Sequence, residues 1–326
     1  MRRPTVQLAI LLLAAGTALP AQPRTTQMET VSGAVPIDKT TQTEDVRFRT
    51  DHSDRMTVPV RLSDTGPYRF LVDTGADRTA ISRDLARKLN LQAGGGASLH
   101  SIGGVSAVST ATVPRLQLTR NVVNVVDAPL LESAHMGADG ILGVDSLRSQ
   151  RVLFDFERKT MSIVPSKSRD AADEPGSIVV TARRRSGRLI VTEAWVNGRR
   201  ITVVLDTGAD VSVINTALRR QLVGHRPADE SKRVELHSVT GQKVPAEYMV
   251  LRRLEMGNVQ LHDLVVVFAD AHTFEALGLN DRPALLLGMN AMRAFKKVSI
   301  DFANKKVRVV LPERSEIELR LAAARL

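Results

Sequence analysis

The sequence predicts a mostly β protein made of two similar halves in tandem, related by a pseudo-twofold axis, with few and short helices. The first reason is a set of sequence landmarks that recurs in one order on both sides of the middle of the chain. The second is the abundance of short runs rich in Val, Ile, Leu and Thr between turn residues, which are typical of strands. A chain of 326 residues is also long enough for both halves to bury a core.

The repeat decides the fold class, because self-similarity at a long period outweighs local propensity. Residues 70–77, FLVDTGAD, recur as residues 203–210, VVLDTGAD. The later landmarks recur in the same order: His100-Ser101-Ile102 as His237-Ser238-Val239, Ile141-Leu142-Gly143 as Leu286-Leu287-Gly288, and Asp155-Phe156 as Asp301-Phe302. Chance similarity would not preserve this order, so we interpret the halves as a duplication.

Strands are expected in the apolar runs, for example at 56–62, 190–196 and 264–268. Asn197-Gly198 is the strongest hairpin signal, because both residue types tolerate the positive φ angles of a tight turn. The segment 64–67, Asp-Thr-Gly-Pro, has the corresponding place in the first half. Each half is therefore expected to begin with a hairpin.

Helices are expected to be short and to occur in pairs, one in each half. Residues 83–89 follow Ser82 and residues 216–222 follow Asn215, and both preceding residues are good N-caps. The other expected pair, which follows the two apolar-apolar-Gly sequences, is 144–149 and 289–295.

The N-terminus has the features of an export signal: Arg2 and Arg3, an apolar run at 8–15 that is too short to span a bilayer, and small residues up to Ala21. We therefore expect an exported protein, periplasmic or secreted, with an uncleaved anchor or a buried N-terminal helix as the alternatives. The expected organisation is a signal peptide at 1–21, a flexible leader at 22–45, an N-terminal half at 46–165, a linker at 166–177, a C-terminal half at 178–311 and a C-terminal extension at 312–326.

The composition excludes several classes of chemistry. Without cysteine the chain has neither a thiol nucleophile nor disulfides. The formal net charge is +10, but the basic residues are scattered and only 3% of residues are aromatic, so nucleic acid is not an expected partner. A preference for an acidic substrate or a membrane surface stays open. No histidine pair has helical metal-binding spacing, and the sequence has neither a phosphate loop nor a dinucleotide fingerprint, so neither a metal nor a cofactor is expected.

The candidate catalytic residues are Asp73 and Asp206, which end the two repeated apolar strands. Burial disfavours a carboxylate unless its charge is used or compensated. Across a pseudo-twofold axis the two carboxylates would face each other, and at such close range they share one proton. The ionised partner can then take a proton from water while the protonated partner hydrogen-bonds a scissile carbonyl. One Asp-Thr-Gly alone is usually a turn, whereas two copies in duplicated halves indicate one hydrolytic site.

The residues that follow each aspartate fit an active-site loop. The glycines let the backbone turn tightly and approach the carboxylates, the threonine hydroxyls can tie the two loops together, and the alanines leave room. The loop residues expected on these grounds are Thr74, Gly75, Ala76, Thr207, Gly208 and Ala209.

These motifs resemble the retropepsin-like aspartic peptidases, in which each half supplies one Asp-Thr-Gly-Ala-Asp and one later apolar-apolar-Gly strand end. The resemblance covers roughly 46–165 and 178–311, and it implies two closed-barrel halves in which these two segments form a psi-shaped loop. The fused halves and the export signal are similar to the periplasmic aspartyl proteases of Gram-negative bacteria, in tandem, single-chain form.

The resemblance also implies two flaps, glycine-tipped hairpins that close over the substrate. They are expected at 98–113 and 234–250, and neither tip has a tyrosine. The flap residues expected to bind substrate are Gly103, Gly104 and Gly241. The chain departs from the retroviral pattern at Val144 and Met289, which stand where the family has an arginine that pairs with the last Asp of the motif. The substrate-binding role of Asp77 and Asp210 therefore stays open.

The expected function is an aspartic endopeptidase that hydrolyses a polypeptide substrate and acts as a monomer, because one chain contains both aspartates. Two alternatives stay open: an inactive binding module with a peptidase fold, and a homodimeric peptidase. Intact Asp-Thr-Gly sequences in both halves disfavour the first alternative, because a binding module has no need of two facing carboxylates.

Overall fold

The computed structural model describes residues 5–7, 13–15, 44–47, 49–50, 56–118, 122–148, 150–166, 177–185, 188–225 and 232–312. Nearly all of the expected signal peptide, leader, linker and C-terminal extension lies outside these residues. Within them the protein is mostly β, with short helices, as predicted. The search for a helix long and apolar enough to cross a membrane, made over the same residues, found none.

The N-terminal half is an eight-stranded sheet in the order β4-β5-β6-β11-β7-β10-β9-β8. Its strands are β4 (Arg49–Thr50), β5 (Met56–Leu62), β6 (Thr65–Val72), β7 (Ala80–Ser82), β8 (Ala93–Ser101), β9 (Gly104–Gln117), β10 (Val122–Leu131) and β11 (Gly140–Leu142). An additional pairing of β5 with β9 closes the ring β5-β6-β11-β7-β10-β9 into a barrel.

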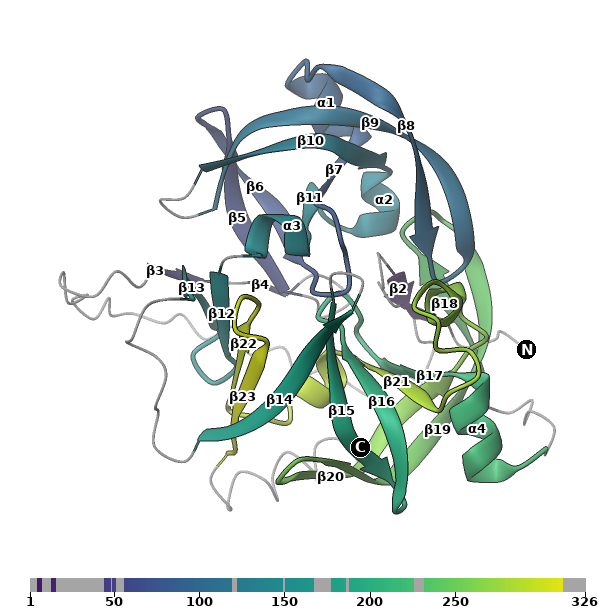
Figure 1. Cartoon of the computed structure of the whole chain (residues 1–326). Coiled ribbons are helices and arrows are strands. Elements are labelled where there is room, and N and C mark those ends of the chain that lie inside the picture. The colour runs from purple at the N-terminus through teal and green to yellow at the C-terminus, as the bar shows by residue number, and fades with distance from the viewer. Residues whose placement is uncertain are drawn as a thin grey trace, which may run out of the picture.

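The C-terminal half repeats this arrangement and lies below the first in Figure 1. Its strands are β15 (Arg188–Val196), β16 (Arg199–Leu205), β17 (Ser212–Ile214), β18 (Arg233–Ser238), β19 (Lys243–Met256), β20 (Val259–Phe268) and β21 (Ala284–Leu287). The pairing of β15 with β19 matches that of β5 with β9. In each half the strand before Asp-Thr-Gly runs parallel to the apolar-apolar-Gly strand, β6 beside β11 and β16 beside β21. The predicted duplication is therefore confirmed.

A sheet to which both halves contribute joins them. Its central pair is β12 (Gln150–Asp155) with β22 (Lys297–Asp301), in which Val152 pairs with Ile300. The flanking strands are β13 (Thr160–Pro165) and β3 (Glu44–Arg47) on one side and β23 (Lys306–Val310) and β14 (Ser177–Arg185) on the other. Two short strands, β1 (Thr5–Gln7) and β2 (Leu13–Ala15), pair with β18.

The helices of the described residues are α1 (Arg83–Lys88), α2 (Ser133–Met136), α3 (Val144–Leu147), α4 (Thr216–Val223), α5 (His272–Ala276) and α6 (Met289–Met292). The predicted caps of α1 and α4 are confirmed, because Ser82 Oγ accepts from the amide of Leu85 (3.1 Å) and Asn215 Oδ1 accepts from that of Leu218 (2.9 Å). Helices α2 and α5 were not predicted from the sequence. Both are short and neither has a side-chain cap, so they carry no start signal.

The two hairpin predictions had different outcomes. Asn197 and Gly198 form the turn between β15 and β16 with φ of 51° and 75°, as a tight hairpin turn requires. The other turn is formed by Ser63 and Asp64, with φ of 45° and 68°, so the predicted segment 64–67 is displaced. Thr65 is β-branched and begins β6, because such side chains disfavour positive φ.

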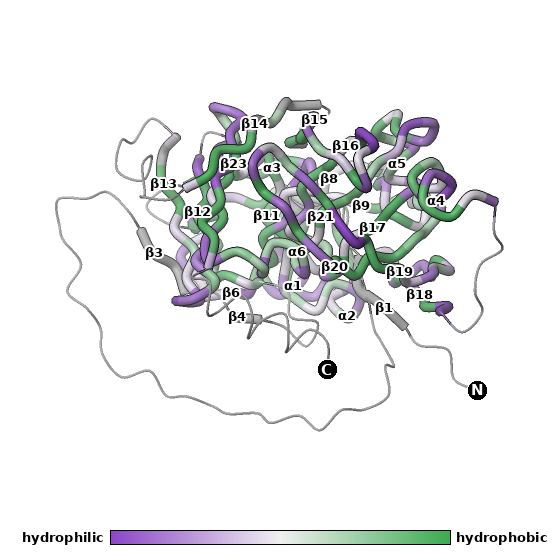
Figure 2. Tube along the Cα trace, turned by 90° about the horizontal axis from the view of Figure 1, so that it is seen from below, coloured by the Kyte–Doolittle hydropathy of each residue, from purple (hydrophilic) through white to green (hydrophobic). Residues whose placement is uncertain are grey.

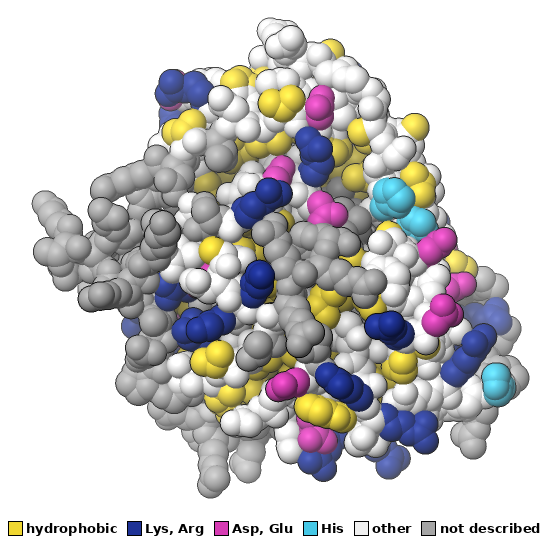
Figure 3. Space-filling model, in the orientation of Figure 1, with side chains coloured by type: hydrophobic (Ala, Val, Ile, Leu, Met, Phe, Trp, Pro, Cys, Tyr) yellow, Lys and Arg dark blue, Asp and Glu magenta, His cyan; other side chains and the backbone are white. Residues whose placement is uncertain are grey.

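Two clusters of buried apolar side chains form the core, and both draw residues from both halves. Hydrophobic stretches follow interior strands such as β12, while α4 mixes hydrophilic and hydrophobic residues and many turns are hydrophilic (Figure 2). The smaller cluster contains Ala76 and Ala209 together with the flap residues Leu99, Ile102 and Leu236, so the flaps and the aspartate loops share one core. On the face in Figure 3, Lys and Arg side chains lie scattered among acidic ones, as expected for a solvated surface.

Candidate active site

Strands β6 and β16 bring Asp73 and Asp206 to equivalent positions. The amide of Asp73 donates to the carbonyl of Leu142 at the end of β11 (3.0 Å), and the amide of Asp206 donates to that of Leu287 at the end of β21 (3.0 Å). Each aspartate is thus held where a buried strand meets its parallel neighbour. The two side chains are 1% and 0% exposed.

Backbone amides of its own loop hold each carboxylate. Oδ1 of Asp73 accepts from the amides of Gly75 (2.7 Å) and Ala76 (3.0 Å), and Oδ1 of Asp206 accepts from that of Gly208 (3.0 Å). Hydrogen bonds to an ionised carboxylate favour its charged form and offset part of the cost of burial.

The two loops face each other closely enough that each carboxylate lies against the other loop. A Cβ added to Gly75 would lie 2.6 Å from Oδ1 of Asp206, and one added to Gly208 would lie 2.3 Å from Cγ of Asp73. Real Cβ atoms essentially never come this close to another heavy atom. Glycine is therefore required at both positions, because any side chain there would displace the opposite carboxylate.

The threonines cross-link the loops in a symmetrical way. The amide of Thr74 donates to Oγ1 of Thr207 and the amide of Thr207 donates to Oγ1 of Thr74, both at 3.0 Å. Each hydroxyl then donates to a carbonyl of the opposite half, Thr74 to Leu205 (3.1 Å) and Thr207 to Val72 (2.7 Å). These four hydrogen bonds hold the aspartates at a fixed separation.

A second layer of polar residues, which was not predicted from the sequence, supports the loops. Oδ1 of Asp145 accepts from the amide (2.9 Å) and the hydroxyl (2.7 Å) of Thr79, whose hydroxyl oxygen accepts from the amide of Gly143 (3.1 Å). The other half repeats this network. Oδ1 of Asn290 accepts from the amide and the hydroxyl of Ser212 (both 2.9 Å), and the hydroxyl oxygen of Ser212 accepts from the amide of Gly288 (3.0 Å). The sequence does contain a signal for this layer: Thr79 and Ser212, both hydroxyl residues, follow Asp73 and Asp206 by the same number of residues.

The second layer also accounts for the glycine of each apolar-apolar-Gly sequence. A Cβ on Gly143 would lie 2.4 Å from the backbone of Arg78, and one on Gly288 would lie 2.7 Å from that of Val211. The next residues donate backbone hydrogen bonds to the loops, from Val144 to the carbonyl of Ala76 (2.8 Å) and from Met289 to that of Ala209 (2.7 Å). Backbone contacts thus join the aspartate loops to α3 and α6, whose first residues replace the family's arginine.

Asp77 and Asp210 lie at the ends of the same loops and are partly exposed. Their carbonyls accept from the amides of Asp145 (3.3 Å) and Asn290 (2.9 Å), which ties the ends of the loops to α3 and α6.

The two predicted flaps meet at their tips (Figure 1). Ile102 and Gly103 form the turn between β8 and β9, and a Cβ on Gly103 would lie 2.7 Å from Cβ of Gln242 in the other flap. Ser101 Oγ donates to Oε1 of Gln242 (3.2 Å). Gly104 begins β9 with open space around it, so it lies outside this contact.

Each flap also contacts a helix of the opposite half. The carbonyl of Ile102 accepts from the amide of His272 in α5 (3.0 Å), and Gly241, with φ of 83°, lies against the ring of His135 in α2. The hydrogen bond from Lys243 across the second hairpin (2.9 Å) lowers the pKa of Glu235, and a hydrogen bond from His237 contributes in the same direction. Each flap tip is thus held against a helix of the opposite half.

Replacing Asp145 with Ala is expected to lower the free energy of unfolding by about 3 kcal/mol, because two donors of the buried Thr79 lose their acceptor. Asp145→Asn, which copies Asn290, is the matched control and should cost under about 1 kcal/mol. Urea unfolding of both variants measures the difference. A loss in Asp145→Ala as small as that in Asp145→Asn would show that the network does not support the loop.

Among the described residues no group of three or more His, Cys, Asp or Glu side chains could hold a metal ion. Comparison with protein families shows that the model of the family described as Aspartyl protease matches residues 58–146 and 192–291. The two matches contain one aspartate loop each. A search of curated proteins found no match. With one family match in each half and the retropepsin-like pairing of β6 with β11 and β16 with β21, the chain belongs to the aspartyl protease family, in a tandem form.

Proposed function

We propose that this protein is an aspartic endopeptidase, active as a monomer, in which Asp73 and Asp206 activate one water molecule. The observation that carries the proposal is the reciprocal contact of the loops, in which each carboxylate lies against the glycine of the other loop. Two buried carboxylates held this close share one proton, and a shared proton supplies an acid and a base to one substrate.

In the proposed reaction the ionised aspartate takes a proton from the water, whose oxygen attacks the carbonyl carbon of the peptide bond. The protonated aspartate donates its proton to the carbonyl oxygen, so a neutral tetrahedral diol forms. The C–N bond then breaks as the nitrogen receives the proton taken from water and one diol hydroxyl returns its proton to the dyad. The products are a carboxylic acid and an amine, and the dyad again holds one proton.

The substrate of this reaction is an extended polypeptide lying between the dyad and the flap tips. Asp77 and Asp210 would accept hydrogen bonds from its backbone amides, which their partial exposure beside the loops supports. Gly103 and Gly241, at the flap tips, would cover it from the flap side. Gly104, the first residue of β9, directly follows Gly103 in this flap.

We also propose that the enzyme acts outside the cytoplasm, on the basis of the export features at its N-terminus. Cell fractionation with N-terminal sequencing of the mature chain tests this. The basic net charge supports an acidic or membrane-associated substrate. If electrostatic attraction to such a substrate contributes, cleavage rates should fall as salt is added.

The function is tested by incubating the purified chain with a diverse peptide mixture and identifying the products by mass spectrometry. Cleavage that is absent from Asp73→Asn prepared in the same way would support the proposal. A folded wild-type chain that cleaves nothing across a wide pH range would contradict it. Pepstatin serves as an additional probe of class, and inhibition by it would support an aspartic dyad.

Flap closure provides a further prediction. Gln242→Ala removes the acceptor of hydrogen bonds from Ser101 and Thr240, both 3.2 Å long. Since each such bond contributes about 0.5–1.5 kcal/mol, we expect KM to rise by about tenfold. Gln260→Ala, at an exposed position of β20, is the matched control and should leave KM unchanged. An unchanged KM in Gln242→Ala would rule out a role of this contact in substrate retention.

A further inference from the structure

Two histidines, one from each half, join the first flap to α5. Nδ1 of His100 in β8 lies 2.9 Å from Nε2 of His272, the first residue of α5, which is a hydrogen-bonding distance. The ring planes are inclined by 17° and the ring centroids are 5.1 Å apart. With the nitrogens this close, such a centroid distance requires the rings to lie nearly in line, so each nitrogen points at the other. His100 and His272 are called the histidine pair below.

The histidine pair lies beside a backbone hydrogen bond that holds the same flap. The amide of His272 donates to the carbonyl of Ile102 at the flap tip (3.0 Å). Helix α5 is a firm support, because Phe274 and Leu277 are buried in the smaller core cluster. His100 is exposed, and β8 is the last strand of its sheet. A change in the contact between the two rings is therefore expected to move the flap and not the helix.

The contact requires one proton between the two facing nitrogens. Nδ1 of His272 lies 3.1 Å from Oε2 of Glu275, and an ionised carboxylate only accepts, so this nitrogen carries a proton. In the neutral ring Nε2 of His272 is then an acceptor, and Nδ1 of His100 donates to it. A first added proton can bind the outer nitrogen of His100, which leaves the contact intact. A second added proton gives both rings a positive charge and an N–H group at the contact, so the hydrogen bond is lost and the rings repel each other.

The charged side chains that surround the histidine pair do not remove this effect. Five of them line the two cavities beside the pair, and all are exposed: Arg78 after the Asp73 loop, Asp127 in β10, Lys243 in β19, Asp270 before α5 and Glu275 in α5. Strand β8 has no other titratable side chain, and the one in β9, Arg115, lies near the far end of that strand. Since solvent and salt screen exposed charges, these groups shift the pH at which the pair takes up protons but do not replace the lost bond.

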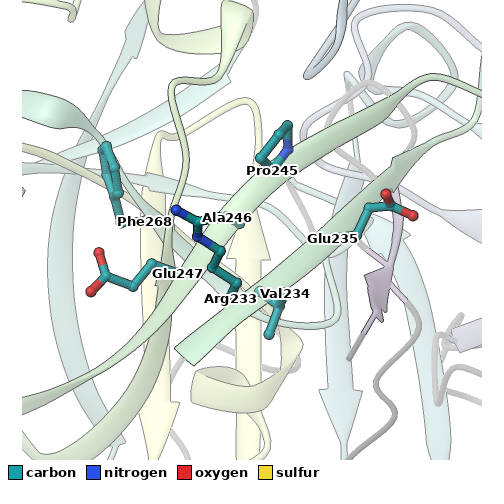
Figure 4. A pocket seen from close by; sticks show the side chains of 7 residues that line it. All are labelled: Arg233, Val234, Glu235, Pro245, Ala246, Glu247 and Phe268. Carbon is teal, nitrogen blue, oxygen red and sulfur yellow. The ribbon is translucent and has the colours of Figure 1, made fainter. Parts of the chain in front are cut away.

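The second flap uses its equivalent histidine in a different way. His237 has the place of His100 in the repeated landmark. Its Nε2 lies 2.9 Å from Oε1 of Glu235 on the same strand, and Lys243 donates to that oxygen as well (2.9 Å). Figure 4 shows Glu235 projecting from β18 on the side away from Phe268. His237 therefore stabilises its own hairpin, whereas His100 connects its flap to the other half.

We propose that His100 and His272 are positioning residues of the peptidase reaction, which hold the first flap over the substrate and make its closure depend on pH. The inference rests on the proposed function and adds the control of substrate retention to it. Histidine is the side chain that ordinarily changes its charge between about pH 5 and 8. The open flap leaves both rings free to bind a proton, whereas the closed flap excludes the last one, so a falling pH favours the open flap. Substrate is then retained less well, and KM rises.

The kinetic test compares KM of the wild type and two variants at about pH 8 and about pH 5. The amide nitrogen of Asn takes the place of Nδ1 and donates without becoming charged, so His100→Asn should match the wild type at the higher pH and have a KM about three- to tenfold lower at the lower pH. His100→Ala should have a KM about three- to tenfold higher at the higher pH and match the wild type at the lower pH. All three should share one kcat at each pH, because the pair does not touch the dyad.

Each variant is compared with the wild type at the same pH, because titration of the dyad affects all of them alike. His262→Asn, at an exposed position of β20, is the matched control and should follow the wild type at both values. If His100→Asn does not fold, His272→Gln takes its place, since the Gln amide lies where Nε2 is and is likewise uncharged.

Flap position is measured separately, without the need for activity. The chain contains no cysteine, so spin labels can be attached to Ala107→Cys in the flap and Asp281→Cys beyond α5, both at exposed positions. Electron–electron distance measurements should show one short distance at about pH 8 and an additional, longer one at about pH 5. In the His100→Asn background only the short distance is expected at both values.

Two results would overturn the inference: a KM of His100→Asn equal to that of the wild type at the lower pH, or a label distance that does not change with pH. A chain whose flap opens at the lower pH but which cleaves no peptide would instead contradict the proposed function. The two failures are therefore distinguishable.

Discussion

Replacing Asp73 with Asn is expected to reduce kcat/KM by about 10⁴-fold, and Asp206→Asn should do the same. The amide cannot take a proton from water, and without two carboxylates the shared proton is lost. The carbonyl oxygen of Asn keeps the size of Oδ1 of Asp73 and can still accept from the amides of Gly75 and Ala76. The fold should therefore be retained. Steady-state kinetics with a fluorogenic peptide, together with thermal unfolding, measure both effects.

Asp281→Asn, at an exposed site, is the matched control for this substitution and should keep wild-type kinetics. Full activity in either Asp73→Asn or Asp206→Asn would contradict the shared dyad. A loss of activity that follows a loss of folded protein would show a structural role instead.

The second large effect is expected from Gly208→Ala. The new Cβ would lie 2.3 to 2.5 Å from Cγ and both oxygens of Asp73, so the carboxylate or the loop must move. Since a displacement of about 1 Å in a catalytic group can cost about 10²-fold in rate, kcat should fall by about that factor. Gly75→Ala should act in the same way on Asp206, by symmetry of the loops.

Gly198→Ala serves as the control for the second prediction. Gly198 lies in the turn between β15 and β16 with φ of 75° and open space around it, so Ala there should cost about 1 kcal/mol in stability and nothing in kcat. Unfolding curves and kcat measured on the same preparations separate the two effects. Wild-type kcat in Gly208→Ala would contradict the described proximity of the loops.

The parts of the fold that the sequence predicted best are those that the duplication repeats. The segments around Asp73 and Asp206 occur twice, so a twofold arrangement followed from the sequence alone, and the structure brings the two loops together. The caps Ser82 and Asn215 were predictable because an N-cap acts through its immediate neighbours.

Other features depend on contacts between distant segments and could not be predicted. The bonds between Thr79 and Asp145 join residues that are distant in the chain, and the antiparallel pairing of β7 with β11 brings them together. The short helices α2 and α5 lack side-chain N-caps, and flap residues distant in the chain contact them.

The central claim is that one chain supplies both members of a single dyad, and mixing two inactive variants tests it most directly. Asp73→Asn and Asp206→Asn are purified, combined in equal amounts, unfolded and refolded together, and assayed against the wild-type substrate. If both aspartates act within one chain, the mixture stays as inactive as each variant alone. Recovery of a substantial fraction of wild-type activity would mean that different chains exchange halves to build the site, and would contradict the account.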